Sequence, residues 1–221
     1  MTPTPPPPRS LLRRLARDDR ALALTEFALS LPILLSLGLV GLETANLAIA
    51  NLRVSNIAML TADSAARVRD SIDEADVNEI FVGARTAGTA LNFTQNGRII
   101  LSSLEPNTAG ANGTSTGQYI RWQRCIGIKN VASAYGAEGK GRTDASLQAV
   151  GPAGNQVAAQ AGTAVMVVEV NYDYQPLVSN RIFGARTITY VSAFNVRQRT
   201  DQVLHNASAM SGRTCDKFSA T

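Results

Sequence analysis

The sequence predicts an α+β fold in which a long N-terminal helix packs against a small antiparallel sheet. Three observations support this prediction. An apolar segment of membrane length covers residues 22–45. Beyond it, apolar residues recur at intervals of three and four as far as about residue 70, which is typical of an amphipathic helix. Four later segments alternate apolar and polar residues, which is typical of strands.

Residues 1–21 form a basic leader. It begins with MTPTPPPP, which favours polyproline II and cannot be helical. The leader holds five arginines and two aspartates, whereas the other 200 residues hold 16 basic and 15 acidic side chains. Because an excess of Arg marks the cytoplasmic side of a membrane helix, we expect a cytoplasmic N-terminus and an exported C-terminal part. The scattered charges beyond the leader do not indicate a nucleic-acid partner.

A membrane-spanning helix needs about 20 mostly apolar residues, and residues 24–42 nearly meet this requirement alone. We therefore predict a transmembrane segment over 22–45, kinked at Pro32, and an amphipathic helical region over 46–91. Glu26 lies near the start of the apolar run, where an ionisable group is costly and commonly marks function. Glu43, at the other end, is expected to be a solvated interface residue.

The exported, β-rich part is predicted to cover residues 92–221. Its strands are expected at residues 98–104, 118–128, 163–174 and 187–197. The alternation within them predicts one covered and one wet face, with the amphipathic half of the helix as the cover. In the second strand, Ile120 and Trp122 are expected to share a face. The Gly-rich link 136–162 is long for a loop, and is either flexible or an insertion.

The chain has two cysteines, Cys125 and Cys215. In an exported domain this even number permits one disulfide with a single possible pairing. Because Cys125 lies in a predicted strand and Cys215 in the C-terminal tail, the bond would pin the tail to the sheet. The alternative is two unpaired thiols.

No pattern in the sequence indicates catalysis. The triplet Gly139-Lys140-Gly141 lacks both the earlier glycine and the Ser or Thr of a P-loop. His205 is the only histidine and is expected to lie in the tail, which leaves little from which to build a catalytic triad or a multi-histidine metal site. We expect no enzymatic activity, no metal, no cofactor and no small-molecule substrate.

The residues around Glu26 resemble a known export signal. A basic leader, the small residue Ala21, four further residues, then Glu26 and Phe27 and an apolar run resemble the class III signal of type IV pilins. The fuller pattern TEFALSLPILL, followed by Glu43, is similar to the TadE-like proteins, which are minor pseudopilins of the Tad (Flp pilus) system. The resemblance covers about residues 20–70 and extends weakly to VEVNYDYQPL and TITYVSAF. The family usually has Gly where this chain has Ala21.

The resemblance implies a pilin-like fold and a role in assembling an adhesive pilus by helix packing. It implies that a prepilin peptidase cleaves between Ala21 and Leu22. It also implies residence in the bacterial inner membrane with a periplasmic domain, and association with the pilus after processing. The implied partners are other Tad pilins and pseudopilins and the inner-membrane assembly platform. Glu26 would pair with the new α-amine of Leu22, and Phe27 would accompany it in assembly.

Two other interpretations remain open at this stage. Ala48-Ile49-Ala50 offers a signal peptidase site, which would release a soluble domain beginning at Asn51. Alternatively, the apolar helix is a simple tether for an extracytoplasmic domain, and Glu26 only extends its carboxylate towards the cytoplasmic interface. Against secretion stand Glu26 within the hydrophobic start and a helical pattern that continues through the cut.

Overall fold

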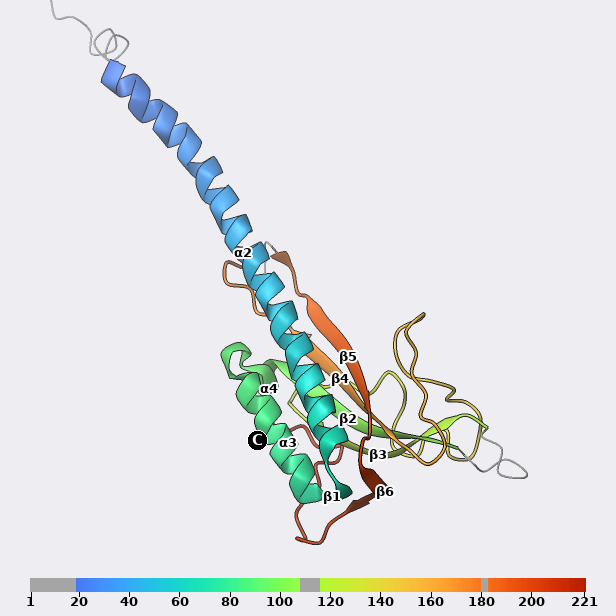
Figure 1. Cartoon of the computed structure of the whole chain (residues 1–221). Helices are drawn as coiled ribbons and strands as arrows, with labels where there is room; N and C mark the ends of the chain where they lie inside the picture. Colours follow the sequence, from blue (N-terminus) through green and yellow to red (C-terminus); the bar gives the residue numbers. More distant parts are fainter. Residues whose placement is uncertain (1–18, 108–115, 180–182) are drawn as a thin grey trace, which may run out of the picture. The chain divides into compact units, whose positions relative to one another are not determined.

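The computed structural model describes residues 19–107, 116–179 and 183–221 (Figure 1). The chain divides into two compact units, residues 1–46 and residues 47–221. Most of the predicted leader, including Arg9, Arg13, Arg14 and Arg17, lies outside the described residues.

Helix α2 (Asp19–Arg67) confirms the predicted long N-terminal helix. It continues through Pro32 as one element, although proline cannot donate a backbone hydrogen bond to the preceding turn. No glycine interrupts the part beyond Gly41. Residues 19–46 belong to the first unit and residues 47–67 to the second.

The four predicted strands form one antiparallel sheet in the order β3-β2-β4-β5 (Figure 1). They are β2 (Gly97–Pro106), β3 (Gln118–Ile126), β4 (Val165–Asp173) and β5 (Thr187–Asn195). Each lies within three residues of its expected bounds. The α+β prediction is therefore confirmed at the level of a long helix and an antiparallel sheet.

One face of the sheet packs against the second half of α2, as the sequence predicts. The buried helix residues include Val54, Ile57 and several alanines, whose small side chains allow the helix to approach the strands closely. Helix α3 (Glu74–Ala87) adds Val77 and Phe81 to the same core. The strands contribute the following buried side chains to it: Ile99, Leu101, Trp122, Ile126, Met166, Val168, Val170, Tyr172 and Ile188.

Helix α3 begins at a reciprocal N-terminal cap. The Asp73 carboxylate accepts a hydrogen bond from the Ala75 amide at 2.9 Å, and the Asp73 amide donates to the Asp76 carboxylate at 2.9 Å. This capping box satisfies two amides at the start of the helix. Two short elements follow, η1 (Thr89–Leu91) and α4 (Phe93–Asn96), and lead the chain into β2.

The expectation of a wet second face is wrong. The long link between β3 and β4 folds over that face, so that Leu147, Val150 and Ala159 pack against Val165 and Val167. Glu169 and Asn171, which alternation alone would place in solvent, are buried at 3% and 9% exposure. Alternation predicts which residues share a face, but it does not predict that a loop covers the polar one.

The expectation that Ile120 and Trp122 share a face is also wrong. In the β2–β3 pairing, Ser103 lies opposite Trp122, but the next residue of β2, Leu104, lies opposite Ile120. The register therefore shifts by one residue between Ser103 and Leu104. Arg121 is therefore an extra residue in β3, as in a β-bulge, and the alternation reverses there. Trp122 packs in the core beneath the helices, whereas Ile120 belongs to the cluster on the second face.

A second, two-stranded sheet was not predicted. It joins β1 (Asp70–Asp73) in parallel to β6 (Arg199–His205). The buried Arg199 guanidinium donates to the Ala65 carbonyl at 3.2 Å and to the Gln202 side chain at 3.0 Å, and so anchors the end of α2. His205, expected in a loose tail, is the last residue of β6 and contacts Asp201 at 2.7 Å.

Candidate functional site

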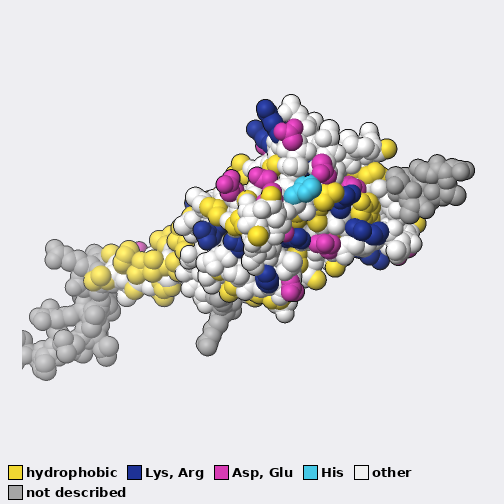
Figure 2. All heavy atoms as spheres, turned by 90° about the horizontal axis from the view of Figure 1, so that it is seen from below, with side chains coloured by type: hydrophobic (Ala, Val, Ile, Leu, Met, Phe, Trp, Pro, Cys, Tyr) yellow, Lys and Arg dark blue, Asp and Glu magenta, His cyan; other side chains and the backbone are white. Residues whose placement is uncertain are grey.

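The apolar part of α2 exposes its side chains. Every residue from 22 to 42 is exposed, including Leu22 at 62% and Phe27 at 58%. Figure 2 shows the hydrophobic side chains in yellow along this segment, whereas the larger unit presents a mixture of charges. The helix is long and apolar enough to cross a membrane. An exposed apolar surface of this length marks a site of contact with lipid or protein.

The hydroxyl groups in this segment are satisfied within the helix. Ser30 donates to the Phe27 carbonyl at 3.1 Å, Ser36 to the Pro32 carbonyl at 2.7 Å, and Thr44 to the Val40 carbonyl at 2.8 Å. A segment immersed in hydrocarbon must satisfy its polar groups internally. The segment therefore presents an almost entirely apolar surface despite its Ser and Thr content.

Glu26 is the exception in this apolar surface. Its side chain is exposed, and no polar group among the described residues contacts the carboxylate. Residues four apart on a helix are neighbours on one face, so Glu26 lies one turn beyond Leu22. A cut between Ala21 and Leu22, in the first turn of α2, would place the new α-amine on the same face as the carboxylate. Phe27 lies beside Glu26 and is exposed as well.

The exposure of the Glu43 side chain differs from the expectation. Its side chain is only 2% exposed, so the expectation of a solvated interface residue is wrong. Buried carboxylates in folded proteins are paired or hydrogen-bonded. The sequence indicated only that Glu43 follows an apolar run, and carried no signal for its burial.

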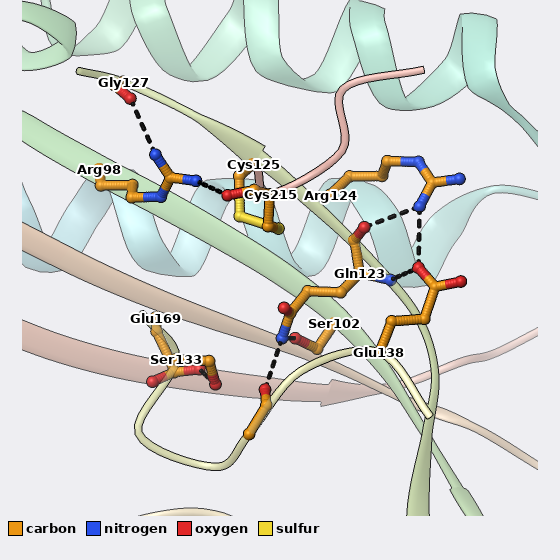
Figure 3. Close-up of a disulfide and its surroundings, with 11 residues drawn as sticks. Arg98, Ser102, Gln123, Arg124, Cys125, Gly127, Ser133, Glu138, Glu169 and Cys215 are labelled. Atoms are coloured by element: carbon orange, nitrogen blue, oxygen red, sulfur yellow. Dashed lines mark hydrogen bonds and ion pairs between the residues drawn. A yellow bond between two sulfur atoms is a disulfide. The ribbon is translucent and has the colours of Figure 1, made fainter. Parts of the chain in front are cut away.

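The disulfide between Cys125 and Cys215 is present, with an S–S distance of 2.07 Å across 90 residues of sequence (Figure 3). The prediction of this pairing is therefore confirmed, and the alternative of two unpaired thiols is wrong. On either side of the bond the C-terminal tail forms hydrogen bonds with the end of β3 and with the residue that follows it. The Cys125 amide donates to the Arg213 carbonyl at 2.8 Å, and the Gly127 amide donates to the Ser219 carbonyl at 2.7 Å.

Arg98 supports this junction and was not identified from the sequence. Its side chain is 1% exposed and donates to the carbonyls of Gly127 and Cys215, at 3.3 and 2.5 Å (Figure 3). The guanidinium carbon lies 4.2 Å from the centre of the Phe218 ring, which is a cation–π contact. Burial lowers the pKa of the Arg98 guanidinium. The sequence signal that could have identified Arg98 was its position at the start of an apolar strand.

Arg124 joins three separate elements beside the disulfide. It contacts Glu74 at the start of α3 at 2.6 Å and Glu138 of the long loop at 3.1 Å. Glu138 in turn accepts a hydrogen bond from the Gln123 amide at 3.0 Å (Figure 3). These contacts hold β3, α3 and the loop together, and we therefore interpret Arg124 as a structural residue.

The described residues contain no group of three or more His, Cys, Asp or Glu side chains arranged to hold a metal ion. Comparisons with protein-family models, with curated proteins and with solved structures found no match for this chain. The features that remain for a functional interpretation are the exposed apolar segment, its single carboxylate and the disulfide-bonded domain.

Proposed function

We propose that this chain is a minor pilin-type subunit, similar to the TadE-like proteins, that takes part in assembling a Tad-type adhesive pilus. The observation that carries the proposal is the position of Glu26. Its carboxylate is exposed in an apolar helix of membrane length, one turn beyond the residue that cleavage after Ala21 would make the N-terminus.

The proposed mechanism is charge pairing between helices. After removal of the leader by a prepilin peptidase, the α-amine of Leu22 carries a positive charge near the apolar phase, where Glu26 carries a negative one. Each charge alone is costly there, and the two neutralise each other within one subunit or between neighbours. Removing one partner of such a buried pair costs about 3–5 kcal/mol. That energy is sufficient to set the register of subunits during assembly.

The proposal places residues 22–45 in the bacterial inner membrane, the leader in the cytoplasm and residues 46–221 in the periplasm. The arginine excess in the leader supports this topology. The disulfide supports it as well, because disulfides persist in oxidising compartments. The proposed partners are other pilins and pseudopilins, the prepilin peptidase and the inner-membrane assembly platform. Catalysis and small-molecule substrates have no part in this role.

The packing of α2 favours this proposal over secretion. A signal peptidase cut after Ala50 would remove Leu47 and Ala50, both of which pack in the core of the larger unit. Ala50 itself is 2% exposed. A cut after Ala21 leaves this core intact.

Substitutions at Glu26 test the proposal. Glu26→Gln and Glu26→Ala should leave expression, membrane insertion and topology intact while abolishing pilus assembly. Glu26→Asp, which keeps the charge, should retain a measurable fraction of assembly. Ser30→Ala is the matched control, because it alters a polar residue in the same segment without changing charge. The readouts are pilus yield and immunoblots of the membrane fraction. Normal assembly by Glu26→Gln would overturn the charge-pair mechanism.

A further inference from the structure

The two edges of the four-stranded sheet differ. At the β3 edge, backbone amides are occupied by other segments: Ile120 donates to the Lys140 carbonyl at 2.9 Å and Cys125 to the Arg213 carbonyl at 2.8 Å. At the opposite edge lies β5, with the sequence TITYVSAFN. It contains no charged residue and no proline. Natural edge strands are usually blunted by lysine, proline or a bulge.

The hydrogen bonds flanking β5 identify which of its backbone groups face outward. Before the strand, the Tyr174 amide donates to the Arg186 carbonyl at 2.8 Å, and after it the Val196 amide donates to the Ala164 carbonyl at 2.9 Å. Both pairs continue the β4–β5 register, and hydrogen-bonded pairs occur at every second position of an antiparallel ladder. The even-numbered residues of β5 therefore bond to β4.

The odd-numbered residues consequently direct their N–H and C=O groups away from the sheet. These residues are Thr187, Thr189, Val191, Ala193 and Asn195. Among the described residues, no hydrogen bond occupies these outward groups. Several β5 side chains are exposed as well, including Thr189 and Tyr190. The strand thus offers a nine-residue backbone template, and an edge of this kind pairs readily with another strand.

We propose that β5 pairs with β5 of a second copy of this chain, in antiparallel orientation, with a two-fold axis at Val191. The pairing joins the two four-stranded sheets into one continuous sheet across the dimer. It depends only on residues of the larger unit, and requires neither cleavage of the leader nor a pilus.

The register follows from the outward groups. A two-fold axis at Val191 places Thr187 opposite Asn195, and Thr189 opposite Ala193, of the other copy. Val191 is the middle residue of β5, so this axis allows all nine residues of the strand to pair. All of these opposed residues have outward backbone groups, so the register forms about ten inter-chain hydrogen bonds. It also opposes Ile188 to Phe194 at a non-hydrogen-bonded position, where side chains approach most closely. Aromatic and β-branched residues are favourable cross-strand pairs.

The absence of charged residues in β5 favours a second copy of this chain as the source of the strand that pairs with it. Within the nine residues of β5, self-pairing opposes no like charges, whereas a charged partner strand would find no complementary side chain on β5. The nearest cations, Arg186 and Arg197, lie outside the nine residues of the strand, and Arg197 contacts Asp63 at 3.0 Å. The pattern of the strand therefore allows self-pairing, and no charge within the strand opposes it.

Cysteine cross-linking of the full-length chain in membranes tests the register. In the proposed dimer the two Val191 Cα atoms lie about 5.5 Å apart, within disulfide range, whereas the two Thr189 Cα atoms lie about 14 Å apart. Under mild oxidation Val191→Cys should give a covalent dimer at least tenfold more efficiently than Thr189→Cys. The double variant Thr189→Cys/Ala193→Cys should cross-link like Val191→Cys. The parent chain, with Cys125 and Cys215 already paired, is the background control.

A second comparison tests the edge itself. The background for this comparison is the Thr189→Cys/Ala193→Cys chain. Adding Val191→Lys places two like charges at the axis and should lower the yield of cross-linked dimer at least tenfold. Adding Val191→Thr, in which the new side chain is close in size to valine, should leave the yield unchanged. Retention of the Cys125–Cys215 bond in each variant establishes folding. Equal cross-linking of Val191→Cys and Thr189→Cys would overturn the proposal. Cross-linking of β5 to a chain of different mass, without a dimer, would overturn it as well.

Discussion

The Arg98 guanidinium donates a 2.5 Å hydrogen bond to the Cys215 carbonyl, 117 residues later in the chain. The same residue Cys215 forms the disulfide to Cys125, on the strand next to that of Arg98. The C-terminal tail is thus fixed twice at one point, once covalently and once by a buried cation. This arrangement makes the tail part of the domain.

Removing the disulfide should loosen the tail and destabilise the domain. In the chain-entropy model, closing a loop of this length contributes about 4–5 kcal/mol. The Cys125→Ser/Cys215→Ser variant should therefore show a large decrease in the free energy of unfolding, and early proteolysis after His205. Denaturant unfolding and limited proteolysis with and without reductant measure both effects. A tail that stays protected in the variant would show that the other contacts suffice.

Replacing Arg98 should weaken the same junction while leaving the cysteines in place. Arg98→Leu removes the donors to the Gly127 and Cys215 carbonyls, and hydrogen bonds from charged groups contribute about 1.5–3 kcal/mol each. The two bonds together predict a loss of about 3–6 kcal/mol in the free energy of unfolding. The control is Arg142→Leu, which removes an exposed arginine over the Tyr119 ring and should cost less than about 1 kcal/mol. Equal losses in the two variants would contradict the assigned role of Arg98.

The pH dependence of stability should contain a contribution from Glu169. Burial raises the pKa of this carboxyl, although hydrogen bonds from the Ser133 hydroxyl and the Ala134 amide partly oppose the shift. A carboxyl whose pKa is raised in the folded state binds its proton more tightly there. Its contribution to stability is therefore lost as the pH rises from the unfolded pKa, about 4.3, through the folded one.

Glu169→Gln should abolish that loss, because the amide does not titrate but can still accept the Ala134 hydrogen bond. The difference in unfolding free energy between Glu169→Gln and the parent chain should increase with pH above about 4.3 and then level off. Chemical denaturation at a series of pH values measures it. A difference that is constant with pH, or that decreases, would contradict the pKa direction.

Much of the fold could be predicted because it depends on local periodicity. The helix from residue 19 to 67 and all four strands of the main sheet follow from spacings of three to four or of two residues. The disulfide followed from the number of cysteines and the expected compartment. These signals are carried by neighbouring residues, and tertiary contacts did not override them.

The features that were missed depend on tertiary contacts. The strands β1 and β6 are short and polar, and are held by pairing with each other across more than 120 residues. The bulge at Arg121 reverses an alternation that the sequence does not interrupt. Burial of Glu169 depends on a loop that folds over it. At the candidate site, the order of Ala21, Leu22, Glu26 and Phe27 was visible, whereas Arg98 resembled any scattered cation.

N-terminal sequencing of the mature protein, purified from native membranes, tests the central claim most directly. The proposed cleavage between Ala21 and Leu22 predicts a chain that begins LALTEF, with the new α-amine one helical turn before Glu26. A chain that begins at Asn51 would identify a secreted domain released by signal peptidase. A chain that keeps Met1 would identify an unprocessed membrane tether, and either result would contradict the pilin-type role.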